Sequence, residues 1–292
     1  MPGNVLWDAF SRSFLDLNFL YYTMGAISIG GLLLATFVMR RSGTLDAHPR
    51  FARWVARVRS ALPAVVVLSL TTLAAGMEGG VERAVQAWHQ LDFTPLVWRV
   101  EGNLIERFQD AARTPARDYL LVTVYTVGAF LFYFVPFFTL VALGRGKNAM
   151  RIAGTMAIVW GVGIVFYLFV PVREVWMTAD APYHYTHVVN VLFERVPSAA
   201  TSDAYDLATN NNFPSLHVAL SCGIATALWL GGERWLAIPG TIVAGGVTVA
   251  TMYLGIHWLS DVIAGLALAF AAAWIVHRRT AREPEAGAPW RR

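Results

Sequence analysis

The stretch Asn210-Asn-Asn-Phe-Pro-Ser-Leu-His217 stands directly before an apolar run, residues 218–230, that carries no charge. Three amides, a proline, a serine and a histidine therefore precede this apolar segment. A second polar group stands where another apolar segment begins, and it consists of Tyr253, His257 and Asp261. We expect the two groups to meet in space, together with Arg173 from a third segment, around a phosphate at a membrane surface.

The composition is typical of a membrane protein. Of 292 residues, 56% are hydrophobic and 14% are charged, whereas a soluble domain carries about 25% charged residues. Apolar runs of roughly 20 residues recur, the length that crosses about 30 Å of hydrocarbon. We therefore predict an all-α fold, a polytopic transmembrane helical bundle of about six to seven spans with amphipathic helices at the interface. The net charge of +4 is modest, and we expect no nucleic-acid partner.

The predicted spans are the apolar segments 19–39, 62–77, 119–143, 152–170, 214–230, 236–254 and 258–276, with a kink expected at Pro136. Residues 1–17 and 78–117 mix charges with aromatic side chains and are predicted to lie along the membrane interface; the second could instead form a small cap. We divide the chain into residues 1–117, N-terminal spans plus interfacial helices; residues 118–277, a helical core; and residues 278–292, a disordered cytoplasmic tail.

Basic residues predict the orientation in the membrane. They gather in the 40–59 loop, at 145–151, at the 233–234 turn and in the tail, and positive loops remain on the cytoplasmic side. The N-terminus is then outside and the C-terminus inside. We expect an integral protein of the cell (plasma) membrane whose active site, with Arg173, His217 and His257, faces the extracytoplasmic side.

Each polar group is suited to a phosphate. An arginine such as Arg173 binds two phosphate oxygens in a fork. His217 lies in the first turn of a predicted helix, where unpaired N–H groups attract anions. His257 and Asp261 are four residues apart and share a helix face. A carboxylate in that position orients one imidazole nitrogen and leaves the other free as a nucleophile or base.

Each signal also has a structural explanation when taken alone. A lone arginine at a helix end is usually a headgroup anchor, a single interfacial histidine is usually structural, and His-x-x-x-Asp is a weak pattern. Their order and their shared predicted face favour a site, and an ionisable residue within an apolar segment, such as Asp261, is costly and indicates function.

Two motifs resemble those of a known family. Phe213-Pro-Ser-Leu-His217 before an apolar helix, and then Thr251-Met-Tyr-Leu-Gly-Ile-His257-Trp-Leu-Ser-Asp261-Val-Ile-Ala-Gly265, are similar to the phosphatidic-acid-phosphatase type 2 superfamily. The resemblance covers about residues 150–277. It implies a helical bundle in which 118–277 is the catalytic core, and metal-independent phosphotransfer, without a cofactor, through a phosphohistidine intermediate.

The resemblance also implies a role for each matching position. His257 would attack phosphorus while Asp261 orients it. His217 would protonate the leaving oxygen and then deprotonate the acceptor. The phosphate oxygens would be bound by Arg173, Ser215 and, in place of a missing arginine, Tyr253.

The chain departs from the family pattern at three places. Leu216 replaces the glycine of Pro-Ser-Gly-His, Ala250-Thr251 stands where Ser-Arg is usual, and the Lys-x6-Arg-Pro motif is absent apart from Arg173. Pro-Ser-Leu-His217 with the 251–254 segment is instead similar to the inositol phosphorylceramide synthase branch, as is Ala181-Pro-Tyr183. That branch moves phosphoinositol from phosphatidylinositol to a lipid alcohol.

The connection 171–213 carries further polar residues. We predict that a polyol headgroup is bound by Asn212, Asp180, His184 and His187. For the asparagines the alternative is a helix-capping loop. A zinc site is not expected, because no third ligand joins the two histidines.

Three functions follow from these observations. The first is an outer-leaflet phosphotransferase that moves phosphoinositol, or a similar headgroup phosphate, from a phospholipid such as phosphatidylinositol to a lipid or glycan alcohol. The alternative is a lipid-phosphate or prenyl-diphosphate phosphatase that uses water. The third is a non-catalytic scaffold or transporter, which the intact His217, His257 and Asp261 disfavour. The absence of Ser-Arg and the presence of Leu216 in place of glycine favour the first function, the phosphotransferase.

Overall fold

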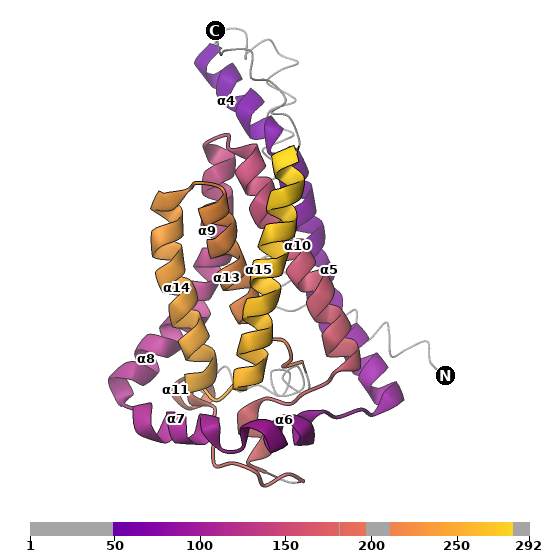
Figure 1. Ribbon diagram of the computed structural model, residues 1–292. Helices are drawn as coiled ribbons and strands as arrows, with labels where there is room; N and C mark the ends of the chain where they lie inside the picture. The colour runs from indigo at the N-terminus through magenta and orange to yellow at the C-terminus, as the bar shows by residue number, and fades with distance from the viewer. Residues whose placement is uncertain (1–48, 181, 197–210, 283–292) are drawn as a thin grey trace.

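The structure, a computed structural model, describes residues 49–180, 182–196 and 211–282. The predicted first span, 19–39, and the predicted interfacial helix 1–17 lie outside the described residues. Within the described ranges the chain folds into an elongated helical bundle with shorter helices at one end (Figure 1). Apart from one bridge between Val172 and Asn211, no β-structure occurs in this part of the chain.

The helices follow one another as α4 (Pro49–Ser60), α5 (Leu62–His89), α6 (Thr94–Glu101), α7 (Leu104–Ala112), α8 (Pro115–Thr123), η1 (Val124–Gly128), α9 (Ala129–Ala142), α10 (Gly146–Phe169), η2 (Val175–Thr178), α11 (Val191–Arg195), α13 (Leu216–Leu230), α14 (Arg234–Tyr253) and α15 (Leu259–Arg282). Here η1 is a π-helical turn and η2 a 3-10 turn. Helices α8, η1 and α9 form one continuous segment, Pro115–Ala142.

Four helices of the described residues are long and apolar enough to cross a membrane: Pro115–Ala142, α10, α14 and the 259–281 part of α15. Two shorter apolar helices are Leu62–Gly76 and α13. An apolar helix therefore occupies each of the six predicted spans that begin at or after residue 62. The prediction of a polytopic, all-α membrane protein is confirmed.

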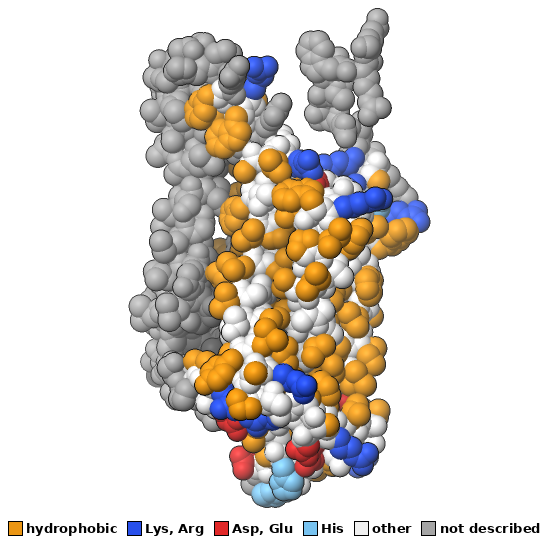
Figure 2. All heavy atoms as spheres, turned by 90° about the vertical axis from the view of Figure 1, so that its left-hand side faces the viewer, with side chains coloured by type: hydrophobic (Ala, Val, Ile, Leu, Met, Phe, Trp, Pro, Cys, Tyr) orange, Lys and Arg blue, Asp and Glu red, His pale blue; other side chains and the backbone are white. Residues whose placement is uncertain are grey.

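The surface has the layering that a membrane requires. Figure 2 shows a broad band of hydrophobic side chains between two ends that carry Lys, Arg, Asp and Glu. Exposed apolar side chains on the four helices that are long enough to cross a membrane include Leu131, Val165, Ile242, Ile263 and Phe270. A wide exposed apolar surface is unusual for a soluble monomer and marks contact with another apolar phase, here lipid.

Helix α13 lies at the centre of the bundle and packs against α10, α14 and α15. Its buried residues include Ala219, Ile224 and Leu228, and α15 contributes the fully buried Ala272 and Ala273. Small residues such as Ala219, Ala272 and Ala273 allow membrane helices to approach closely and gain van der Waals contact, since burial from lipid supplies little hydrophobic driving force.

The helix that contains the second predicted span continues beyond it. The apolar part ends at Gly76, one residue before the predicted end at residue 77, but α5 itself continues to His89. The end of α5 packs along α10. Gln86 donates to the backbone oxygen of Tyr167 at 2.9 Å, and Nε2 of His89 lies 2.6 Å from the backbone oxygen of Leu168. These bonds to the C-terminal carbonyls of α10 favour continuation of the helix.

One further boundary and the expected kink differ from the sequence prediction. Helix α15 extends to Arg282, so the start of the predicted tail is helical; Arg151 donates to Thr280 there, and Arg278 lies over the Trp274 ring. Residues 283–292 lie outside the described residues. Pro136 is accommodated within α9, and the departure from regular α-helix lies earlier, at η1.

Helices α6, α7 and α11 lie at the end of the bundle opposite α4 (Figure 1). Helix α7 packs against α14, α6 against α15 and α11 against α8, and the three helices together form a cap at this end of the bundle. The loop between α14 and α15, which carries His257, faces this cap, and the candidate site lies beneath it.

Candidate active site

His257 belongs to the short loop between α14 and α15. The loop turns at Gly255, whose φ of +77° favours glycine. A Cβ at this position would lie 2.5 Å from the backbone oxygen of Val189. The His257 backbone N–H donates to the Thr251 oxygen at 3.1 Å, and the residue is 3% exposed. The loop backbone is therefore held in place, and the imidazole that it carries is buried.

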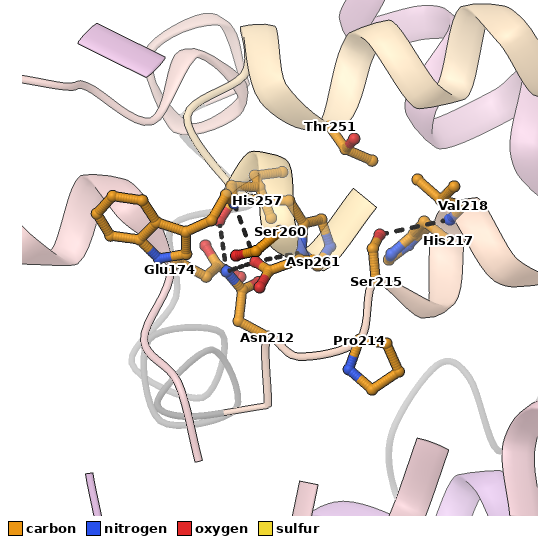
Figure 3. A network of polar contacts seen from close by, with 12 residues as sticks. Glu174, Asn212, Pro214, Ser215, His217, Val218, Thr251, His257, Ser260 and Asp261 are labelled. Carbon is orange, nitrogen blue, oxygen red and sulfur yellow. Dashed lines mark hydrogen bonds and ion pairs between the residues drawn. The ribbon is translucent and has the colours of Figure 1, made fainter. Parts of the chain in front are cut away.

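Asp261 orients the His257 ring from the first turn of α15. Its Oδ2 lies 3.4 Å from His257 Nδ1 and accepts from Asn212 Nδ2 at 2.7 Å and from the Trp258 backbone N–H at 2.9 Å (Figure 3). Asp261 is fully buried, so these bonds compensate for lost water. With Nδ1 directed at the carboxylate, Nε2 is the nitrogen left to react.

Asn212 joins three segments of the site. Its amide donates to Asp261 and also to the backbone oxygen of Ile256 at 3.0 Å and that of Arg173 at 3.4 Å. Its own N–H donates to the Val172 oxygen at 3.2 Å. We predicted that Asn212 contacts a headgroup; the structure buries it at 1% exposure, with its amide nitrogen bonded to these groups.

His217 lies on the first turn of α13, two residues after its N-cap Ser215. The Ser215 hydroxyl accepts from the Val218 N–H at 3.4 Å, which is a standard cap. The Ser215 backbone N–H donates to the backbone oxygen of Asp261 at 3.0 Å, so a hydrogen bond joins the N-terminal ends of α13 and α15. The ring centroids of His217 and His257 lie 6.3 Å apart. The structure thus brings together the two histidines that the sequence singled out.

Arg173 follows α10 and lies beside the same network. Its backbone oxygen accepts from Trp258 Nε1 at 2.9 Å, and its N–H donates to the Thr94 hydroxyl at 2.9 Å. The guanidinium lies over the Tyr183 ring, 5.5 Å from its centroid. Its Nε is buried and, within the described residues, has no hydrogen-bond partner. That N–H is therefore available to a ligand.

Tyr253, predicted to replace a phosphate-binding arginine, has a different environment. Its hydroxyl donates to Asp118 Oδ1 at 2.5 Å and accepts from the Thr114 N–H at 3.3 Å. Arg113 and Arg195 both pair with the other oxygen of Asp118. This network ties α14 to α8, and the Tyr253 hydroxyl has no remaining donor for a phosphate.

The three other predicted headgroup residues lie on the exposed loop after η2. Asp180, His184 and His187 are all exposed. Within the described residues, no hydrogen bond joins their side chains to His217 or His257. In the same part of the chain, no three His, Cys, Asp or Glu side chains gather as a metal site would require.

The structure adds residues that the sequence analysis missed. Tyr125 places its hydroxyl 3.3 Å from His217 Nδ1. Glu174 lies beside the Asn212 and Asp261 network (Figure 3). Glu101, at the end of α6, accepts from the N–H groups of Leu259 and Ser260 at 2.8 and 2.6 Å. Only Glu174, adjacent to Arg173, had a sequence signal, as an acid beside a predicted phosphate ligand.

Burial shifts the protonation of two site residues outside the spans. Burial, together with the nearby His217, lowers the pKa of His257 well below its ordinary 6.5. Its ring is therefore neutral at pH 7. Burial raises the pKa of Glu174 from 4.5 to about 8, against the opposing hydrogen bond from Trp176. Glu174 is then uncharged at neutral pH and does not repel an anion.

The fold and the site define an integral membrane protein with paired imidazoles at its helix ends. The family model of the PAP2 superfamily matches residues 98–275, more than half of the chain. The chain belongs to the PAP2 superfamily. The match includes α7 and the end of α6, which the resemblance seen in the motifs had left unaccounted for.

Curated relatives match shorter stretches. The chain is similar to an undecaprenyl-diphosphatase of Sulfolobus acidocaldarius, at 37% identity over 23% of this chain and 31% of that protein. It is similar to a decaprenylphosphoryl-5-phosphoribose phosphatase of Mycobacterium tuberculosis, at 30% identity over 36% of this chain and 60% of that protein. It is also similar to a lipid A 4'-phosphatase of Bacteroides thetaiotaomicron, at 37% identity over 24% of this chain and 33% of that protein. The matches thus cover less than two thirds of each relative, and no solved structure matches.

Proposed function

We propose that this protein is a phosphatase that hydrolyses a phosphate ester or diphosphate carried by a membrane lipid. The pair His217 and His257, 6.3 Å apart with Asp261 behind the second ring, is the observation that carries the proposal. The three relatives are by name phosphatases, and their names describe prenyl-linked or lipid A phosphates. These comparisons favour the alternative of the sequence analysis over the phosphotransferase that it preferred.

In the proposed mechanism His257 is the nucleophile. Its neutral Nε2 forms a bond to phosphorus while the bond from phosphorus to the lipid oxygen breaks. Asp261 accepts from Nδ1–H, keeps the reactive tautomer and stabilises the positive charge that the ring acquires. Attacking and leaving atoms lie roughly in line in phosphoryl transfer. A second imidazole on the far side of phosphorus is therefore suitably located for the leaving group.

His217 is the proposed acid and base. It gives a proton to the departing lipid oxygen, then takes one from water as the water oxygen attacks the phosphohistidine and the P–N bond breaks. Water supplies the oxygen. The products are the lipid alcohol and inorganic phosphate from a monoester, or a lipid monophosphate and inorganic phosphate from a diphosphate.

The phosphate oxygens are bound, in this proposal, by the unpartnered Nε–H of Arg173 and by backbone N–H groups at the start of α13. Ser215 contributes its position as the N-cap. We place no phosphate contact on Tyr253. For Asp180, His184 and His187, contact with a headgroup remains a proposal that their exposure permits.

A specific observation also supports a second function, phosphotransfer from phosphatidylinositol to a lipid or glycan alcohol. Thr251, where the family's arginine is usual, is fully buried and donates to the Thr248 oxygen. In this proposal Arg173 is then the guanidinium that binds the phosphate, without a second arginine at position 251. A phosphodiester carries one negative charge and a monoester carries about 1.5 to 2 at pH 7, so fewer cations suit a diester donor.

Leu216 gives little support to the second function, phosphotransfer. It is buried, and a Cβ on Gly163 of α10 would lie 2.4 Å from its Cδ2. The leucine therefore fills the space above a glycine of the neighbouring helix, which is a packing role. The inositol phosphorylceramide synthase branch rests on the motif similarity alone.

The experiment is to incubate the purified protein separately with a polyprenyl diphosphate, with phosphatidic acid, and with phosphatidylinositol plus ceramide. Release of inorganic phosphate, lost in His257→Ala and retained in the control His277→Ala near the other end of α15, would support the phosphatase. Transfer of phosphoinositol without phosphate release would establish the second function instead. A fully active His257→Ala variant would refute the nucleophile in either case.

The side of the membrane also belongs to the proposal. With positive loops in the cytoplasm, the cap of α6, α7 and α11 lies on the outer side, and we infer that the protein works at the outer leaflet of the plasma membrane. A cysteine placed in α7, for example at Gln109's exposed neighbour Asp110, should react with an impermeant thiol reagent on whole cells.

A further inference from the structure

The segment that faces His217 is not a regular α-helix. Between α8 and α9 the chain forms one π-helical turn, η1, at Val124–Gly128. A π-turn inserts one extra residue into a helix, and at 3.6 residues per turn this rotates the following side chains by about 100°. Such turns occur frequently at functional sites. Tyr125 lies in this turn.

Tyr125 contacts the His217 ring in two ways. Its hydroxyl lies 3.3 Å from Nδ1, and the two rings are 4.5 Å apart at their centroids, tilted by 32°. Farther along the same segment, Tyr133 donates to the backbone oxygen of His217 at 3.4 Å. The segment therefore contacts His217 at both its ring and its backbone.

We propose that Tyr125 is a positioning residue, which binds Nδ1 of His217 and thereby reserves Nε2 for the oxygens of the substrate. The inference rests on the proposed function, in which His217 is the acid and base. It extends that function by giving the second histidine an orienting partner of its own, as Asp261 is for His257.

The two partners suit two different tasks. A carboxylate stabilises a positive ring, which fits a nucleophile that becomes a phosphohistidine. A tyrosine hydroxyl is neutral and can accept from Nδ1–H whether the ring is charged or not. His217 has to release a proton in one step and take one up in the other, and a neutral partner fixes the tautomer without trapping that proton.

The test uses the dependence on the leaving group. An alkyl phosphate needs the acid because its alkoxide leaves poorly, whereas 4-nitrophenyl phosphate releases a stable phenolate without one. We expect Tyr125→Phe to lower kcat for dodecyl phosphate by about 10-fold, a part of the 10²–10⁴ that a general acid contributes. For 4-nitrophenyl phosphate we expect less than about a twofold change, with KM for both substrates unchanged.

Two variants serve as controls. Tyr119→Phe removes a hydroxyl from an exposed ring on α8 and should leave both rates unchanged. Tyr133→Phe removes the bond to the His217 backbone and should affect both substrates equally. Thermal unfolding of each purified variant checks that Tyr125→Phe, which keeps the ring, is folded.

The outcomes separate the two proposals. If the wild-type protein releases phosphate from neither substrate, the proposed function is at fault. If the wild type is active but Tyr125→Phe slows both substrates by the same factor, or neither, Tyr125 is a packing residue and this inference is wrong. A selective loss with the alkyl substrate supports it.

Discussion

Glu101 and Ser260 are joined by a hydrogen bond of 2.6 Å, in which the Glu101 carboxylate accepts from the Ser260 backbone N–H. The neighbouring Leu259 N–H donates to the same carboxylate at 2.8 Å. Helix α6 thus caps the N-terminus of α15, the helix that carries Asp261. This contact gives a role to part of the 78–117 segment, whose purpose the sequence did not indicate.

Removal of the cap should weaken the site. In Glu101→Ala the first N–H groups of α15 lose their acceptor, and we expect a loss of about 1–3 kcal/mol of stability, as for a buried donor left unsatisfied. Activity should fall because Asp261 lies on that first turn. Glu101→Gln keeps one acceptor and should recover part of both. Thermal unfolding and phosphate release measure the two effects; wild-type behaviour of Glu101→Ala would show that the cap is dispensable.

Asp261→Asn should abolish most activity while the fold persists. An amide can still accept from Trp258 and resembles the carboxylate in shape, but it cannot stabilise a positively charged His257. We expect kcat to fall by about 10⁴, as orienting carboxylates of histidines do elsewhere. Burst measurements with a labelled lipid phosphate should show no phosphohistidine. Asp110→Asn, at an exposed position of α7, is the matched control, and equal losses in both variants would argue against an orienting role.

Glu174 should make stability depend on pH. Its pKa rises from 4.5 in the unfolded chain to about 8 in the folded protein because of burial. The unfolded state therefore releases this proton first, so the contribution is full below pH 4.5 and is lost progressively as pH rises to about 8. Thermal unfolding from pH 5 to 9 should show this decline in the wild type and a shallower one in Glu174→Gln. Parallel curves would contradict the assignment.

The Gly255 turn should tolerate no side chain. In Gly255→Ala the new Cβ would meet the Val189 oxygen at 2.5 Å and Val188 Cγ1 at 2.6 Å, at a φ of +77°. We expect a loss of about 1–3 kcal/mol and a displaced His257. Gly245→Ala, where the Cβ has open space in α14, should be neutral or slightly stabilising. A melting temperature of Gly255→Ala equal to that of the wild type would disprove the clash.

The helix ends near His217 and His257 could be predicted from sequence because polar residues at the edge of apolar runs have few alternatives. A proline, a serine cap and a His-x-x-x-Asp spacing restrict local geometry strongly. The proximity of the two rings then follows from helix packing that brings α13 and α15 together. The chemical roles assigned to them remain predictions.

Other features depend on contacts between distant segments and left no local signal. Tyr125 contacts His217 from within a π-turn, and nothing in the sequence of residues 124–128 indicates that turn. Glu101 caps a helix that begins far along the chain. Tyr253 matches a motif position, yet its hydroxyl bonds to Asp118, whose burial beside Arg113 and Arg195 no sequence pattern reveals.

The depth of the reaction centre follows from how α13 lies against α10. At one end of this helix pair, Asn148 of α10 donates to the Gly231 oxygen after α13. At the other end, Leu216 of α13 lies against Gly163 of α10, and α10 continues beyond this point from Ile164 to Phe169. At about 1.5 Å per residue, that overhang is about 9 Å. Phe166 and Phe169 on the overhang are exposed apolar side chains. Under the proposed function, a lipid that reaches His217 would have to lower its charged head past this overhang, and we expect thinner bilayers to shorten that descent.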